Sequence, residues 1–138
     1  MMCDGNCCKR CRRRIASAYL LRLRGYEEAA MILKNRYEYA LYVHNSEADY
    51  LLSEFREMER EENMVRRELF RSLSAMDNDY SREVLWQLYI ERKQPDEAAK
   101  LLGISERMVR KLQMKGLRSL EVPIEFINAV IRRWKDNR

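Results

Sequence analysis

The fold of this chain is decided by residues 81–120, which read SREVLWQLYIERKQPDEAAKLLGISERMVRKLQMKGLRSL. Pro95 predicts the start of a helix, because proline suits the first helical position, and Gly103 predicts its end, because glycine readily takes the left-handed conformation. Ser105 is a typical N-cap for a second helix. Apolar residues recur at helical spacing and predict a buried stripe on each helix: Ala98, Leu101 and Leu102 on the first, then Val109, Leu112, Leu117 and Leu120 on the second.

The other face of the second predicted helix is basic and consists of Arg107, Arg110, Lys111, Lys115 and Arg118. Two short helices joined by a tight glycine turn, the second one basic, form the geometry that lays a helix in the major groove of DNA. The alternative is a helical hairpin inside an all-α core, whose charges are simply solvated. The turn and the one-sided charge favour the first interpretation, so double-stranded DNA is the expected partner.

Residues 80–121 resemble the region-4 helix-turn-helix of bacterial sigma factors. The middle helix and turn of that family match Glu97-Ala98-Ala99 and Leu102-Gly103-Ile104-Ser105, and its recognition helix matches Val109-Arg110 and Leu117-Arg118 with Leu120. With its charged helical segment in front, the chain is also similar to small phage transcriptional regulators of the ArpU type. The resemblance implies a sequence-specific regulator of the phage or prophage type, and RNA polymerase is a further partner of sigma-like domains.

The resemblance also assigns DNA contacts to six residues. They are Glu106, Arg107, Arg110 and Lys111, which match positions that face bases in the sigma-like family, and Lys115 and Arg118, which are expected to meet phosphates. Arg110 is the main candidate for base recognition, because arginine can grip the two acceptors of guanine. Glu106 and Met108 depart from the residues common in the family, so the bases recognised there are expected to differ.

Composition and charge agree with a helical, nucleic-acid-binding protein. With 138 residues, one domain or a small domain plus an arm is expected. Charged residues make up 36% and Gly and Pro are few, which favours an all-α fold with much exposed helix. Basic ends flank an acidic middle: the net charge is +6 over residues 1–36, −4 over 37–72, −2 over 73–101 and +5 over 102–138. Such clustering indicates a polyanionic partner. No membrane span or signal peptide is expected, and the expected location is therefore the cytoplasm.

Residues 1–14 are predicted to form a Cys-rich basic arm. Its thiols, Cys3, Cys7, Cys8 and Cys11, can supply four ligands to one zinc ion. A closed zinc site normally uses two separated pairs of ligands, however, so the alternative is an exposed, reduced arm without metal. No other cofactor is expected. The basic run from Lys9 to Arg14 can contact DNA phosphates in either case.

Residues 15–76 are predicted to form a helical or coiled-coil oligomerisation region. Helices are expected over 15–24 and 26–43, interrupted at Gly25, and over 47–76 after a break at His44-Asn45-Ser46. The last helix has an apolar seam that alternates by three and four: Ala48, Leu51, Phe55, Met58, Glu62, Val65, Leu69, Ser72 and Met76. It fits an antiparallel hairpin with residues 26–43, a dimeric coiled coil, or both. We expect a homodimer or a larger homo-oligomer, and a two-fold dimer would reach DNA sites about 34 Å apart.

Residues 77–121 are predicted to be the DNA-binding domain, beginning after the turn at Asp77-Asn78-Asp79 with a helix over 80–92. The core stripe expected for that helix is Val84, Leu85, Leu88 and Tyr89. Residues 122–138 are predicted to form a C-terminal amphipathic helix that packs on the stalk, on the helix-turn-helix or on a second copy. Its apolar face holds Ile127, Val130, Ile131 and Trp134.

Two other classes of protein fit part of the pattern. One is a phage DNA-packaging protein similar to a small terminase subunit, although in that family the helix-turn-helix usually leads the chain and here it trails. The other is a helical adaptor that does not bind DNA. The sequence shows no glycine-rich phosphate loop and no nucleophile with its base, so no enzyme activity is expected. The predicted fold is all-α: a helical hairpin or coiled-coil stalk, a sigma region-4-like helix-turn-helix and a C-terminal helix.

Overall fold

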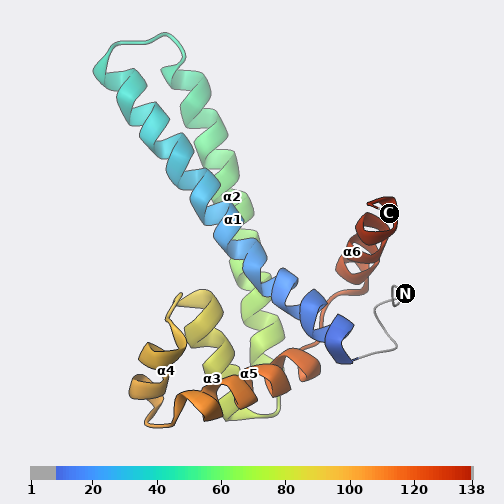
Figure 1. Ribbon diagram of the computed structural model, residues 1–138. Coiled ribbons are helices and arrows are strands. Elements are labelled where there is room, and N and C mark those ends of the chain that lie inside the picture. Colours follow the sequence, from blue (N-terminus) through green and yellow to red (C-terminus); the bar gives the residue numbers. More distant parts are fainter. Residues whose placement is uncertain (1–8, 138) are drawn as a thin grey trace. The chain divides into compact units, whose positions relative to one another are not determined.

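The computed structural model describes residues 9–137, and this part of the chain is all-α, as predicted (Figure 1). It forms six α-helices and one π-helical segment: α1 (Lys9–Tyr42), α2 (Ala48–Ser74), α3 (Asp79–Leu85), η1 (Trp86–Ile90), α4 (Pro95–Leu102), α5 (Glu106–Ser119) and α6 (Ile124–Asp136). None of the described helices is long and apolar enough to span a bilayer.

The chain divides into two compact units. Residues 21–69 form the first, which we call the hairpin unit, and described residues 9–20 and 70–137 form the second, which we call the core unit. Helices α1 and α2 contribute to both. The predicted segments divide the chain at other places, since residues 9–20 fall in the same unit as α3, α4, α5 and α6.

In the hairpin unit, α1 and α2 run antiparallel and are joined by a short loop (Figure 1). Two ion pairs connect them: Arg22 with Glu68 at 3.6 Å and Arg66 with Glu27 at 3.1 Å. Arg66 also pairs with Glu62 of its own helix at 3.1 Å. All these charges are partly exposed, so each pair adds about 0–1 kcal/mol and mainly fixes the register of the two helices.

The apolar seam predicted on α2 serves this hairpin. Val65 and Leu69 are buried, and Leu51, Phe55 and Met58 are half-buried within the unit. On α1 the buried residues facing them are Leu23, Ala30 and Ala40. Leu41, which lies in the last turn of α1 next to the loop, is 51% exposed.

The interruption predicted at Gly25 is wrong, because α1 continues through it from Lys9 to Tyr42. A single glycine costs a helix about 1 kcal/mol, which the packing of the turns on either side outweighs.

Helix α1 also begins inside the predicted arm, so the segment from Lys9 to Arg14 is helical. The buried residues Ile15 and Ala16 then hold these first turns in the core unit. The predictions for residues 1–8 lie outside the described part of the chain.

In the core unit, the stripe predicted after the Asp77-Asn78-Asp79 turn is confirmed: Val84, Leu85, Leu88 and Tyr89 are all buried. Asn78 caps α3 by accepting a hydrogen bond from the Ser81 N–H at 2.9 Å. The helix predicted over 80–92 is present over residues 79–90, but its second half, from Trp86 to Ile90, is the π-helical segment η1. A π turn holds more residues than an α turn, and Gln87, Leu88 and Tyr89 are all buried in it.

Helix α6 packs on the first turns of α1. The rings of Tyr19 and Phe126 lie 5.3 Å apart, and the Arg14 guanidinium lies 4.8 Å from the ring centroid of Trp134. Val130 is buried. The other apolar residues predicted on this face, Ile127, Ile131 and Trp134, are half-buried. Helix α6 was expected to pack on the stalk, on the helix-turn-helix or on a second copy. The structure shows it in contact with the first turns of α1, where the predicted stalk begins.

Candidate nucleic-acid interface

Helix α4 begins and ends where the sequence predicts. Pro95 is its first residue, and Gln94 before it forms a capping box with Glu97, whose carboxylate accepts a hydrogen bond from the Gln94 N–H at 3.1 Å. Gly103 ends the helix with φ 68°, in the left-handed region that glycine takes without strain. The turn is closed by the Ile104 N–H, which donates to the Ala99 carbonyl at 3.0 Å.

Ser105 begins α5, as predicted. Its backbone is extended, and its Oγ accepts a hydrogen bond from the Met108 N–H at 3.1 Å. This bond satisfies one of the N–H groups that have no partner within the first turn of a helix. The serine therefore sets the residue at which the candidate recognition helix starts, and with it the direction of every side chain that follows.

Loss of this cap is expected to destabilise the core unit. Ser105→Ala should lower the free energy of unfolding by about 1 kcal/mol, since alanine cannot accept the Met108 N–H. Ser105→Asp is the matched control, because aspartate caps as well as serine and should leave stability nearly unchanged. Urea denaturation followed by circular dichroism measures both. Equal stability of Ser105→Ala and the wild type would contradict this role for the hydroxyl.

The buried face of α5 is anchored by Val109, Leu117 and Leu120, as predicted, whereas Leu112 is only half-buried. In α4 the prediction for Leu101 is wrong, because this side chain is 60% exposed. The two alanines Ala98 and Ala99 are both buried, so the inner face is centred between them. At about 100° per residue, Leu101 then falls about 110° away from that centre, whereas Leu102 lies close to it.

Gly116 allows α5 to lie close against α3. A Cβ at this position would be 3.0 Å from Leu85 Cδ1 and 3.3 Å from Ser81 Cβ, both tighter than ordinary van der Waals contact. Leu85 and Ser81 are themselves fully buried. The backbone of α5 is therefore held directly against α3, and its orientation in the core unit is closely determined.

A polar network adds a second anchor, which the sequence analysis missed. Gln113 on α5 donates from Nε2 to the hydroxyl of Tyr89 at 3.1 Å, and the same hydroxyl lies 3.2 Å from Ser17 Oγ on α1. The signal was present in the sequence, because a tyrosine in a buried stripe needs a hydrogen-bond partner for its hydroxyl. The identity of the partners depends on contacts between residues far apart in the chain.

The outward surface of α5 carries the predicted DNA-contact residues. Five of them are exposed: Glu106, Arg107, Arg110, Lys111 and Lys115. Within residues 9–137, none of these five forms an ion pair with another side chain. Arg118 is half-buried, and its Nε donates a long hydrogen bond, 3.4 Å, to the Met114 carbonyl. The structure thus leaves four cations and one carboxylate of this helix free to meet a ligand.

The positions of these residues around the helix differ. By helical spacing, Arg107 and Lys111 lie opposite the buried Val109 and Gly116, and Lys115 lies about 110° from them. Glu106 and Arg110 lie on the flank nearer Leu117. Met108 and Met114 are 41% and 42% exposed and interleave with the charges. The surface therefore combines cations with soft apolar side chains, a composition that can contact phosphates, base edges and thymine methyl groups.

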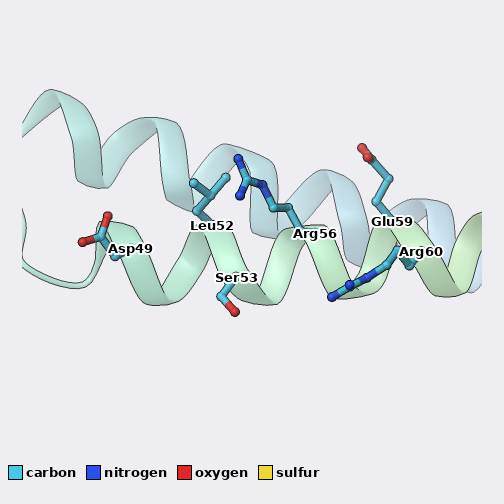
Figure 2. Close-up of a pocket in the computed structure, with 6 residues that line it drawn as sticks. All are labelled: Asp49, Leu52, Ser53, Arg56, Glu59 and Arg60. Carbon is cyan, nitrogen blue, oxygen red and sulfur yellow. The ribbon is translucent and has the colours of Figure 1, made fainter.

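The remaining candidate features hold no constellation of reactive groups. Among residues 9–137 no group of three or more His, Cys, Asp or Glu side chains is placed to bind a metal ion. Cys11 lies half-buried in α1, and the other three cysteines of the predicted zinc site lie outside the described residues. A hollow of about 560 Å³ runs along α2 (Figure 2), lined by Asp49, Leu52, Ser53, Arg56, Glu59 and Arg60. Because all six come from one helix, it is an open feature of the surface.

Comparison of the chain with protein-family models, curated proteins and solved structures gave no match.

Proposed function

We propose that this chain is a sequence-specific DNA-binding transcriptional regulator of the phage or prophage type, and that α4 and α5 form its helix-turn-helix. The observation that carries the proposal is the contrast between the two faces of α5. Its inner face is fixed by Val109, by the close approach of Gly116 to Leu85 and by the Gln113–Tyr89 hydrogen bond. Its outer face presents cations that no carboxylate of the described chain neutralises.

In this proposal the residues of α5 divide their roles along the helix. Residues near the start of a recognition helix reach base edges, so Arg107, Arg110 and Lys111 recognise bases. Glu106 can accept a hydrogen bond from the amino group of cytosine, and Met108 can contact a thymine methyl group. Lys115, two turns farther on, contacts phosphate and supplies affinity that does not depend on sequence.

The regulator is proposed to act as a homodimer, since two copies present two recognition helices to a site with two-fold symmetry. Sigma-like domains in other proteins also dock on RNA polymerase, which makes the polymerase a second partner within the same proposal. A helical adaptor would be distinguished from both DNA-binding classes, the regulator and the DNA-packaging protein, because it does not bind DNA.

A salt titration of Lys115→Ala tests the phosphate contact. The variant should bind specific and random duplexes more weakly by the same factor, and the slope of log K against log[salt] should fall by about one. Lys34→Ala is the matched control, because Lys34 is an exposed lysine in the hairpin unit. Fluorescence anisotropy with labelled duplexes gives both slopes.

The same titration decides the proposal as a whole. A wild-type protein without salt-dependent binding to any duplex would be an adaptor. Selection from a random duplex library tests sequence specificity: a recovered consensus supports the sequence-specific regulator, and the absence of one contradicts it.

A further inference from the structure

Helix α1 has a second apolar face in the hairpin unit, and no residue of that unit covers it. Leu21, Met31, Ile32, Tyr39 and Tyr42 are 38%, 59%, 52%, 68% and 83% exposed. Helical spacing places Leu21, Ile32 and Tyr39 on the side of α1 opposite the buried Leu23 and Ala30, whereas Met31 and Tyr42 lie on the flank, about 90° and 110° from them. A helix in a two-helix hairpin needs one apolar stripe, and a surface helix is otherwise polar on its outer face. Large exposed apolar side chains on a second face are typical of a protein–protein contact.

Gly25 lies on the same outer face, and no contact within the hairpin requires a glycine there. It is exposed, and a Cβ at this position would meet nothing within 4 Å. Glycine inside a helix costs about 1 kcal/mol relative to alanine. Since no neighbour in the described chain requires its small size, the residue indicates a close approach by something outside the described chain.

The outer face is complementary to itself when two copies run antiparallel about a two-fold axis at Ile32. Residues equally far from Ile32 on either side then lie opposite each other. Gly25 meets Tyr39 of the second copy, so a position without a side chain faces a large ring. Glu28 meets Arg36 of the second copy, and the symmetry makes this ion pair twice. Within residues 9–137 neither Glu28 nor Arg36 forms an ion pair.

A parallel pairing of the two α1 helices lacks this complementarity of charge and size. It sets Glu28 against Glu28 and Arg36 against Arg36, and like charges opposed across an interface are strongly unfavourable. It also places glycine opposite glycine and tyrosine opposite tyrosine, so that size complementarity is lost. The charges and the side-chain sizes therefore select a second copy of this chain in the antiparallel direction.

We propose that the outer face of α1 between Leu21 and Val43 is the homodimer interface, with two hairpin units packed antiparallel about Ile32. The inference rests on the homodimer included in the proposed function and names the surface that forms it. It requires no contact with DNA. The seam of α2, for which the sequence left a hairpin, a dimeric coiled coil or both open, is used inside each hairpin.

Charge reversal tests the interface directly. Glu28→Arg and Arg36→Glu should each weaken dimerisation at least about tenfold, because each places like charges opposite one another twice. An equimolar mixture of the two variants should recover a dimer, since one chain then carries arginine at both positions and the other carries glutamate at both. The double variant E28R/R36E should also dimerise. Multi-angle light scattering over a range of concentrations gives the masses.

Control variants distinguish this surface from the rest of the hairpin unit. Arg67→Glu reverses an exposed charge on α2 and should leave the dimer intact. Ile32→Asp should give a monomer, and circular dichroism shows whether the helices remain. A folded wild type that is monomeric at about 100 µM overturns the dimer. Titration of that monomer with DNA then tests DNA binding independently, so failure of the dimer is distinguished from failure of the proposed function. A dimer that resists both single reversals overturns the antiparallel surface, and so does a mixture that stays monomeric.

Discussion

Arg110→Ala is expected to weaken binding to the specific DNA site by about 1–3 kcal/mol while affecting random DNA much less. Arg110 lies one turn past the Ser105 cap, next to the buried Val109, and its guanidinium is exposed. A base-contacting arginine makes two hydrogen bonds to guanine that are lost on the wrong base, whereas a phosphate-contacting arginine binds every sequence alike. The effect should therefore depend on the duplex.

The measurement uses duplexes selected from a random library by the wild-type protein, beside scrambled duplexes of equal composition. Arg132→Ala on α6 is a matched control, because it removes an exposed arginine from another helix of the core unit. Equal loss on selected and scrambled duplexes, with an unchanged circular dichroism spectrum, would make Arg110 a phosphate contact. Lys111 and Arg107 would then be the remaining candidates for base recognition.

The parts of the fold that the sequence predicts well are those specified by single residues. Pro95, Gly103 and Ser105 each act through the backbone at their own position, by a missing N–H, a left-handed φ and a capping hydroxyl. All three lie in the structure where they are expected. The all-α class follows from the same local preferences summed along the chain.

The errors arise where contacts between distant residues decide the structure. The interruption at Gly25 was inferred from the local pattern, and packing overrides it. The helix over 80–92 was also predicted from its local pattern, which does not distinguish the π-helical segment η1 from an α-helix. The inner face of α4 was placed through Leu101 because Ala98, Leu101 and Leu102 follow helical spacing, whereas Ala98 and Ala99 are the buried residues. The apolar outer face of α1 was not predicted, because its residues alternate along the sequence with those of the face that packs on α2. Tyr37 and Tyr39, for example, lie on opposite sides of the helix.

For the candidate site, the sequence predicted the exposed face of α5 but little of what supports it. Exposure of Arg107, Arg110 and Lys111 follows from their spacing relative to Val109. The Gln113–Tyr89–Ser17 network joins three elements whose proximity no local pattern encodes. The exposed residues of such a helix are thus easier to predict than the contacts that orient the helix.

The core beneath α5 gives the largest expected effect on stability. Leu85→Ala should lower the free energy of unfolding by about 2–5 kcal/mol, since Leu85 is fully buried and its loss leaves a cavity. Leu101→Ala is the control: a leucine of the same unit that is 60% exposed should change stability by about 0.5 kcal/mol or less. Urea denaturation measures both.

Gly116→Ala should be destabilising in the wild type and tolerated when Leu85 is already alanine. The new methyl would lie 3.0 Å from Leu85 Cδ1 and 3.1 Å from Leu85 Cγ, atoms that Leu85→Ala removes. Overpacking of this kind typically costs about 1–3 kcal/mol, and much of it should be relieved in the double variant, with Ser81 Cβ at 3.3 Å as the remaining neighbour. The two effects should therefore be non-additive by about 0.5–3 kcal/mol, the range for residues in contact. Additive effects in the double-mutant cycle would show that α5 is not held against α3 through Gly116 and Leu85.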